Sequence, residues 1–103
     1  MKIKKIYYAH SKQFYDTVRE MNEYAFLYDY YSPHKVINPA HLDYSGMKKY
    51  LEVVSQCDTL VASELDGYIG KGVFSELARA MSDGIKVEVL RKEGNKYGKL
   101  ITK

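Results

Sequence analysis

The chain has 103 residues, of which 46% are hydrophobic and 28% are charged, and its formal net charge is +3. These totals fit one domain, residues 1–103, with a modest core, and argue against a disordered chain. The single cysteine, Cys57, excludes an intrachain disulfide and a cysteine-rich zinc site. The weak positive charge suits a small anionic ligand and gives little support to nucleic-acid binding. The N-terminal run lacks the long apolar stretch of a signal peptide or a membrane span, so we expect a cytoplasmic protein.

The first half of the chain alternates predicted strands and helices. Ser11 is a suitable cap for the first helix, and Asn38-Pro39 stops the second strand. In chain order we expect a strand at residues 3–9, a helix at 12–28, a strand at 35–37 and a helix at 47–56. The first helix is predicted from apolar residues at helical spacing, which are Phe14, Val18, Met21, Ala25 and Tyr28.

The second half continues the alternation. The unbroken apolar run Leu60-Val61-Ala62 is typical of a strand that is buried on both faces of a parallel sheet. A glycine-rich loop follows, and then a helix that Gly84 is expected to close from the position after its last turn. The expected elements are a strand at residues 58–63, a helix ending before residue 84, a strand at 85–90 and a last strand at 99–101.

This order of elements predicts an α/β fold. Right-handed crossovers between parallel strands give a three-layer α/β/α sandwich around a small, mostly parallel sheet of four or five strands, Rossmann-like or flavodoxin-like. Ligands of such sheets bind beyond the carboxyl ends of the strands. We therefore expect the loops at residues 10–12, 38–43 and 64–72 to meet at one edge and form a pocket.

The loop Gly70-Lys71-Gly72 and the helix that follows it are the leading candidate for a functional site. We expect Glu76 in the first turn of this helix, where a carboxylate can act as a nucleophile or as an acid or base. A solvated carboxylate favoured by the helix dipole is the alternative interpretation. The helix N-terminus can bind an anion, so Lys71, Gly72 and Ser75 are candidate phosphate ligands. The spacing differs from that of a Walker loop.

The first loop offers further candidates for substrate binding. Ser11 and Lys12 could hold the same phosphate, and Ser11 could cap the helix at the same time. Tyr8, near the end of the strand, is predicted to line the pocket, whereas its neighbour Tyr7 is predicted to belong to the core. His10 is either a substrate contact or an ordinary loop residue.

No metal site or other cofactor is predicted. His34 and His41 have no partner at the spacing of metal ligands. The chain contains 11 tyrosines and no tryptophan, and tyrosine combines apolar area with a hydroxyl that suits a wet cleft or a partner interface.

Four pieces of the sequence together resemble the nucleoside 2-deoxyribosyltransferase family, which includes 2′-deoxynucleoside 5′-phosphate N-hydrolases. The resemblance runs from Ile6 to about Leu90. Its most specific piece is the last, in which a glycine loop, a glutamate and a small-residue helix occur in register. The four pieces are Ala9-His10-Ser11, Asn38-Pro39-Ala40, Cys57-Asp58 before an apolar strand, and Gly72-Val73-Phe74-Ser75-Glu76-Leu77 with Ala80 and Gly84.

The resemblance implies a reaction at the N-glycosidic bond of nucleosides or nucleoside 5′-monophosphates. The residue that matches Glu76 is the family's nucleophile, which attacks the anomeric carbon and releases the base. Water in the hydrolases, or a second base in the transferases, then resolves the glycosyl ester. The resemblance also implies that Asn38 and Gly70 help to form the substrate pocket, and that the protein is a homodimer or a larger homo-oligomer.

Two departures from the family pattern bear on the reaction. Gly70 stands where transferases carry an aspartate that orients the base, which favours the hydrolase branch. Tyr50 stands where many members carry an aspartate that serves as the acid. Such an acid is needed to protonate the departing base. Asp66 and Glu64, in the expected loop, are the leading replacements, and Asp43 is a third candidate.

Two other functions remain open at this stage. The chain could be a catalytically silent module that binds or senses a nucleotide in the same pocket. It could also be a small interaction protein whose tyrosines form the partner surface. The retained Glu76 favours the enzyme, whereas Gly70 and Tyr50 favour the silent module.

Overall fold

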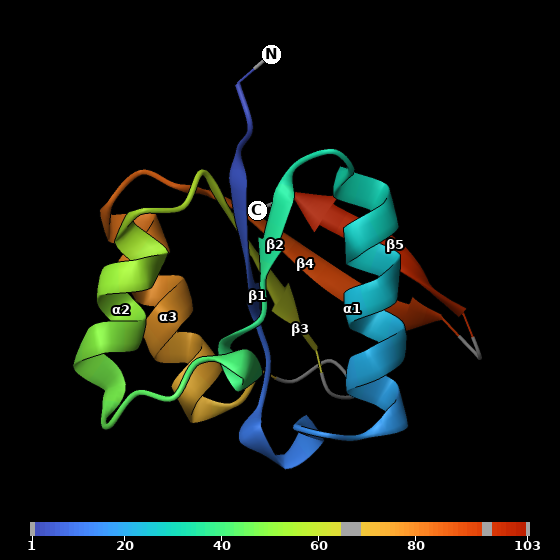
Figure 1. The fold of residues 1–103 in the computed structure, drawn as a ribbon, viewed down its shortest axis with the longest axis horizontal. Coiled ribbons are helices and arrows are strands. Elements are labelled where there is room, and N and C mark those ends of the chain that lie inside the picture. Colours follow the sequence, from blue (N-terminus) through green and yellow to red (C-terminus); the bar gives the residue numbers. More distant parts are fainter. Residues whose placement is uncertain (1, 65–68, 94–95, 103) are drawn as a thin grey trace.

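The computed structural model describes residues 2–64, 69–93 and 96–102, and its elements follow the predicted alternation (Figure 1). The strands are β1 (Lys5–Ala9), β2 (Lys35–Ile37), β3 (Thr59–Ser63), β4 (Lys86–Glu93) and β5 (Lys96–Thr102). The α-helices are α1 (Val18–Tyr31), α2 (Met47–Ser55) and α3 (Lys71–Ser82), and the short 3-10 helices are η1 (Lys12–Phe14) and η2 (Pro39–His41).

The strands form one sheet in the order β2-β1-β3-β4-β5, which confirms the α/β prediction. The first four strands are parallel, and β5 adds to β4 as an antiparallel edge strand. All five residues of β3 are buried, as its apolar run predicts. Within the described residues, no helix is both long and apolar enough to cross a membrane.

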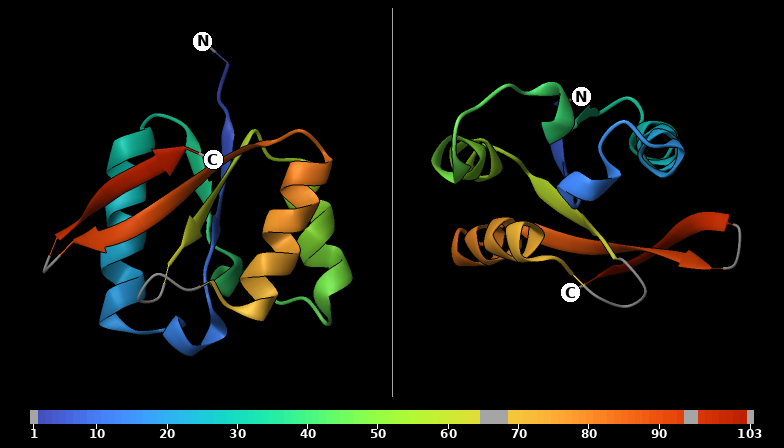
Figure 2. Two further views of the ribbon diagram at one scale, coloured as in Figure 1. Left: turned by 180° about the vertical axis from the view of Figure 1, so that it is seen from behind. Right: turned by 90° about the horizontal axis from the view of Figure 1, so that it is seen from below.

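The helices cover the two faces of the sheet unequally (Figures 1 and 2). One apolar cluster joins β1 and β3 to α2 and α3, and includes Tyr7, Val54 and Val73. The other cluster joins the same strands to α1, and includes Tyr8 and Leu27. Because successive side chains of a strand point to opposite faces, these neighbouring tyrosines serve different layers.

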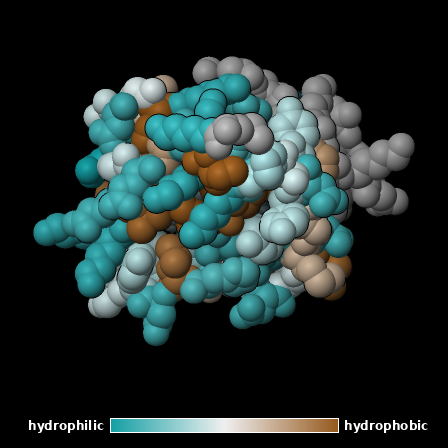
Figure 3. All heavy atoms as spheres, turned by 45° about the horizontal axis from the view of Figure 1, so that its top comes forward, coloured by the Kyte–Doolittle hydropathy of each residue, from teal (hydrophilic) through white to brown (hydrophobic). Residues whose placement is uncertain are grey.

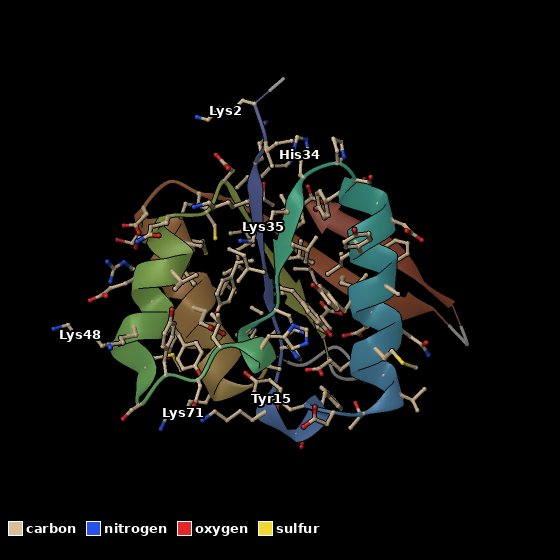
Figure 4. The ribbon with its side chains drawn as sticks, in the orientation of Figure 1. Lys2, Tyr15, His34, Lys35, Lys48 and Lys71 are labelled. Atoms are coloured by element: carbon tan, nitrogen blue, oxygen red, sulfur yellow. The ribbon has the colours of Figure 1, made fainter. Side chains whose placement is uncertain are left out.

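The surface around the N-terminal ends of the strands differs in character from the two buried layers. Viewed obliquely from that side, hydrophilic side chains cover most of the molecule, with apolar atoms between them (Figure 3). Lys2 and Lys35 lie on this side (Figure 4). The edge where the parallel strands end lies at the opposite end of the fold.

Helix α1 begins later than the sequence predicts. Ser11 caps the short helix η1, because its hydroxyl accepts a bond from the Gln13 N–H at 3.4 Å. The chain then turns at Asp16, whose φ is 62°, and Thr17 caps α1 by accepting from the Glu20 N–H at 3.2 Å. The Asp16 N–H in turn donates to the Glu20 carboxylate at 3.1 Å. This local capping, which apolar periodicity does not reveal, moves the helix start to Val18.

The buried face of α1 is also different from the predicted one. Val18, Met21 and Tyr28 of the predicted apolar stripe are each more than 60% exposed. The buried residues of the helix are Glu20, Glu23 and Leu27. The buried carboxylates have hydrogen-bond partners: His10 for Glu20, and Tyr8, Arg19 and Ser63 for Glu23. Burying a charged group is tolerable only with such partners, and all of them except Arg19 lie 10 to 40 residues away in the sequence.

The boundaries of the second half differ from the predictions by small amounts. Gly84 does follow the last turn of α3 with φ 71°, as predicted. Glu76 lies in the second turn of α3, because the helix begins at Lys71. Strand β4 continues to Glu93 and strand β5 begins at Lys96, so both are longer than the strands expected at 85–90 and 99–101. Residues 94 and 95, between them, lie outside the described residues.

Candidate active site

A cavity of about 320 Å³ lies at the carboxyl edge of the sheet, between the end of β1 and the start of α3. Figure 4 shows Tyr15 and Lys71 on this side of the molecule. The first and third predicted loops contribute to its wall, and α2, α3 and the residue after η1 supply the rest. The lining residues are His10, Ser11, Lys12, Tyr15, Met47, Tyr50, Gly70, Lys71, Gly72, Val73 and Glu76.

Glu76 is buried at the wall of this cavity and is held by Tyr7. The side chain of Glu76 is carried on the inner face of α3, and the whole residue is only 6% exposed. The Tyr7 hydroxyl, which comes from β1 in the same layer, donates a hydrogen bond to Glu76 Oε2. Burial raises the pKa of Glu76 to about 7, although the bond from Tyr7 acts in the opposite direction. A carboxyl group with such a pKa can exchange between charged and neutral forms near neutral pH.

The phenols beside Glu76 remain protonated at neutral pH. Burial and the neighbouring charge of Glu76 raise the pKa of Tyr7 far above its ordinary value. Burial, and then the charge of Glu76, raises the pKa of Tyr15 to about 12. Both hydroxyls are therefore hydrogen-bond donors toward a carboxylate or a ligand.

The mouth of the cavity is cationic. Lys12 and Lys71 are both exposed and approach it from η1 and from the first residue of α3. Gly70 occupies the cap position of α3, so within the described residues no side-chain oxygen caps the first N–H groups of the helix. Glu76 is the one carboxylate among the lining residues that the structure describes. Together the two ammonium groups and the helix N-terminus favour an anionic group at the entrance.

His10 lines the cavity as predicted, but its ring nitrogens have other partners. Nε2 contacts Glu20 Oε2 at 2.5 Å and Nδ1 contacts the Tyr8 carbonyl at 3.1 Å. The ring stacks on Tyr8 at 3.9 Å between centroids and tilts against Tyr15 at 5.0 Å. The His10 ring is thus held in place as part of the cavity wall, and both of its nitrogens already have hydrogen-bond partners.

Tyr8 and Ser75 do not reach the cavity. Tyr8 points to the α1 layer, where its hydroxyl donates to Glu23 Oε1 at 2.6 Å. The prediction that Tyr8 lines the pocket is therefore wrong, whereas Tyr7 is buried in the core as predicted and reaches Glu76 from there. The Ser75 hydroxyl donates back to the Lys71 carbonyl at 3.3 Å and is not among the lining residues.

Asn38 lies in a different hollow. A second cavity, of about 300 Å³, is formed by α1 and η2 on the other side of the His10–Glu20 pair. Asn38 Oδ1 accepts from the Ala40 N–H at 3.0 Å, and its buried Nδ2 has no partner among the described residues. The second predicted loop therefore serves this hollow rather than the cavity at Glu76. Its lining residues are Asp16, Thr17, Glu20, Met21, Tyr24, Asn38 and His41.

Glu64 is also placed away from the cavity. Its carboxylate accepts two hydrogen bonds from Arg91, at 2.8 and 3.0 Å, and its carbonyl accepts one from Arg19. Both oxygens of a carboxylate in such a bidentate pair are occupied by the guanidinium, so Glu64 is poorly placed to act on a ligand in the cavity. Asp66 lies outside the described residues. Where the chain is described, no group of three His, Cys, Asp or Glu side chains is arranged to hold a metal ion.

Sequence reasoning missed several lining residues. Tyr15 falls within the predicted first helix, and Tyr50 stands out in the sequence only as a departure from the family pattern. Tyr50 is tied to the loop before α2, because its hydroxyl donates to the Leu42 carbonyl at 3.1 Å and accepts from the Tyr44 N–H at 3.3 Å. Tyr7 is not a lining residue, but strand alternation, which puts Tyr7 and Ala9 on one face, is the signal in the sequence for its contact with Glu76.

Replacing Tyr7 by Phe is expected to raise the titration midpoint of Glu76. The variant loses the hydrogen bond that lowers the pKa of Glu76, while burial still raises it above the ordinary value. We expect the midpoint to move from about 7 upward by about one pH unit, the equivalent of one net hydrogen bond. Carbon-13 NMR of the labelled glutamate carboxyls across pH measures it directly.

Tyr8→Phe is the matched control for this titration. It removes the same hydroxyl from the neighbouring residue but on the opposite face of the sheet. The midpoint of Glu76 should stay unchanged in this variant. An unchanged or lower midpoint in Tyr7→Phe would contradict the placement of the two tyrosines.

Comparisons with known proteins give a likeness of fold. No protein-family model matches the sequence, and no curated protein matches it either. Among solved structures, a 2-desoxiribosyltransferase from Leishmania mexicana superposes with a TM-score of 0.65 at 17% sequence identity. The match covers 87% of this chain and 65% of the other, so this chain spans about two thirds of that enzyme's length. The α/β fold of this protein is therefore one that a deoxyribosyltransferase also uses.

Proposed function

We propose that this protein cleaves or transfers the N-glycosidic bond of nucleosides or nucleoside 5′-monophosphates, with Glu76 as the nucleophile. The observation that carries the proposal is the buried Glu76 carboxyl, held by the Tyr7 hydroxyl at the wall of a ligand-sized cavity. A carboxylate on one face of the sugar stabilises an oxocarbenium-like transition state and can then bond to the anomeric carbon. The likeness of fold to a deoxyribosyltransferase supports the same reaction class, and membership of that family is part of the proposal.

The cationic mouth favours a substrate that carries a 5′-phosphate. Lys12, Lys71 and the uncapped start of α3 surround the entrance, whereas the carboxylate lies inside. A nucleoside monophosphate bound with its phosphate at the entrance would direct the sugar inward toward Glu76. In the transferases an aspartate at the position of Gly70 orients the base. Gly70 has no side chain to do this, which favours water as the acceptor.

Base release from a panel of nucleosides tests the proposal. Deoxynucleosides, ribonucleosides and their 5′-monophosphates are incubated with the protein, and free base is measured by chromatography. We expect release from at least one monophosphate, faster than from the matching nucleoside, and none with Glu76→Ala. Adding a second free base distinguishes transfer from hydrolysis, because transfer yields a new nucleoside.

A silent nucleotide-binding module is the second candidate function. It is favoured by one observation, that Glu76 is the sole carboxylate among the described residues that line the cavity. Tight binding of a nucleotide by calorimetry, with no base release from any panel member, would support this module and overturn the enzyme.

We also propose that the protein forms a homodimer or a larger homo-oligomer. Phe74 and Met81 on the outer side of α3 are 62% and 64% exposed, and Ala78 lies between them at helical spacing and is exposed too. A contiguous apolar stripe of this kind is typical of an interaction surface. Light scattering should give at least twice the monomer mass, and Phe74→Glu should return it to the monomer. A wild-type protein that is monomeric at high concentration contradicts this proposal.

A further inference from the structure

The cavity contains one tyrosine whose hydroxyl has no partner within the described part of the chain. Tyr15 follows η1, and its ring is set against the His10 ring at 5.0 Å between centroids. Tyr15 and Glu76 line the same cavity. The hydroxyl of Tyr15 thus shares a cavity with the proposed nucleophile and is free to donate to a ligand.

Most of the other donors of the cavity are committed or lie at its mouth. Both nitrogens of His10 are engaged, and the Tyr50 hydroxyl already donates to the Leu42 carbonyl. Lys12 and Lys71 are exposed at the entrance, where they suit a phosphate. Among the described lining residues this leaves the hydroxyls of Ser11 and Tyr15. A phenol is a much stronger acid than an aliphatic alcohol, so Tyr15 is the better proton donor of the two.

We propose that Tyr15 is the catalytic residue that donates a proton to the departing base. This assignment rests on the proposed N-glycosidic reaction. A carboxylate Oε of Glu76 bonds to C1′, the bond from C1′ to the base nitrogen breaks, and its electron pair passes to the base. The base takes the Tyr15 hydroxyl proton and leaves a phenolate. Water then attacks C1′, gives its proton back to Tyr15 and frees the Glu76 carboxylate.

Electrostatics within the cavity favour this proton transfer as the reaction proceeds. The negative charge of Glu76 is one cause of the raised pKa of Tyr15. That charge is lost when Glu76 becomes a neutral ester. The phenol is therefore a weak acid before the bond breaks and becomes a stronger one as the base departs.

A pair of substrates that differ in the need for an acid tests the assignment. The base of 2′-deoxyguanosine 5′-monophosphate needs a proton to leave well, whereas its N7-methyl derivative already carries a positive charge. With Tyr15→Phe we expect kcat for guanine release to fall by a factor of about 10² to 10⁴, the usual contribution of a general acid. Release of 7-methylguanine should fall by less than about tenfold. The rate of spontaneous loss of the methylated base is measured in the presence of Glu76→Gln and subtracted.

Two matched variants keep the result specific. Tyr50→Phe removes another cavity hydroxyl, one that is already bonded, and should affect both substrates equally. Asp66→Asn tests the carboxylate that sequence reasoning offered as the acid. A thermal melt confirms that Tyr15→Phe, which keeps the ring against His10, retains the fold.

Each outcome separates the two proposals. Guanine release that Tyr15→Phe lowers no more than 7-methylguanine release overturns the role of Tyr15 and leaves Glu76 as nucleophile. The role of Tyr15 is also overturned if guanine release falls more than 7-methylguanine release in Asp66→Asn but not in Tyr15→Phe. Release of neither base by the wild-type protein, with no base released from the wider panel, overturns the proposed function itself.

Discussion

Glu76→Gln is expected to stop base release and at the same time to stabilise the fold at pH 8. The nucleophile is removed, so release should fall by a factor on the order of 10³ or more. The stabilisation follows from burial, which raises the pKa of Glu76 to about 7 from its ordinary 4.5. Gln keeps the shape of Glu and can still accept the bond from Tyr7.

The sign of this stability effect follows from proton binding. Between pH 4.5 and pH 7 the folded protein holds a proton at Glu76 more often than the unfolded chain does. The unfolding free energy of the wild-type protein therefore falls as pH rises through this window and stays lowered above it. Glu76→Gln lacks this loss, so the variant should gain about 3 kcal/mol over wild type at pH 8 and far less at pH 5.

Urea unfolding at pH 5 and pH 8 measures this difference. Glu52→Gln is the control, because Glu52 is an exposed glutamate of α2, and it should shift stability little at either pH. An advantage of Glu76→Gln that is equal at the two pH values would contradict a buried carboxyl with a raised pKa. Base release by Glu76→Gln at the wild-type rate would show that Glu76 is not the nucleophile.

Glu23→Ala is expected to lower the unfolding free energy by about 3 to 5 kcal/mol, the usual loss when one member of a buried charged network is removed. Glu23 is 1% exposed and accepts bonds from Tyr8 at 2.6 Å, Ser63 at 2.8 Å and Arg19 at 3.2 Å. Its truncation leaves a cavity and three donors without their acceptor, one of them a guanidinium. This network joins α1 to the sheet, so the whole layer should weaken.

Urea unfolding compares Glu23→Ala with two milder variants. Glu23→Gln keeps the volume and one acceptor oxygen, and should lose less than Glu23→Ala. Tyr8→Phe removes one donor and leaves the carboxylate with its other two partners, so its loss should be smaller still. If Glu23→Ala loses less than about 1 kcal/mol, the buried network does not hold α1 in place.

Local sequence signals predicted the order of elements and the position of the cavity. Leu60-Val61-Ala62 forms a fully buried central strand, and Gly84 ends α3 with a positive φ. The loop at Gly70 leads into the helix that carries Glu76, and both line the cavity. These features depend on a few consecutive residues, whose apolar runs and glycine positions determine local conformation directly.

Packing decided which side of each element faces inward. Helical spacing of Val18, Met21 and Tyr28 predicted an apolar inner face, yet those side chains are exposed. Glu20 and Glu23 are buried instead because His10 and residues of the sheet provide their partners across the chain. Such partners are separated by 10 to 40 residues in the sequence, so no local pattern indicates them.

The sequence by itself determined an α/β chain with a glycine loop and a glutamate at the carboxyl edge of its sheet. Tertiary structure decided what surrounds that glutamate. The sheet order places α3 opposite Tyr7 and α1 opposite Tyr8, and this assigns one tyrosine to Glu76 and the other to Glu23. The late start of α1 frees Tyr15 to line the cavity. Alternation along a strand is local, but which face receives which helix depends on crossovers between distant strands.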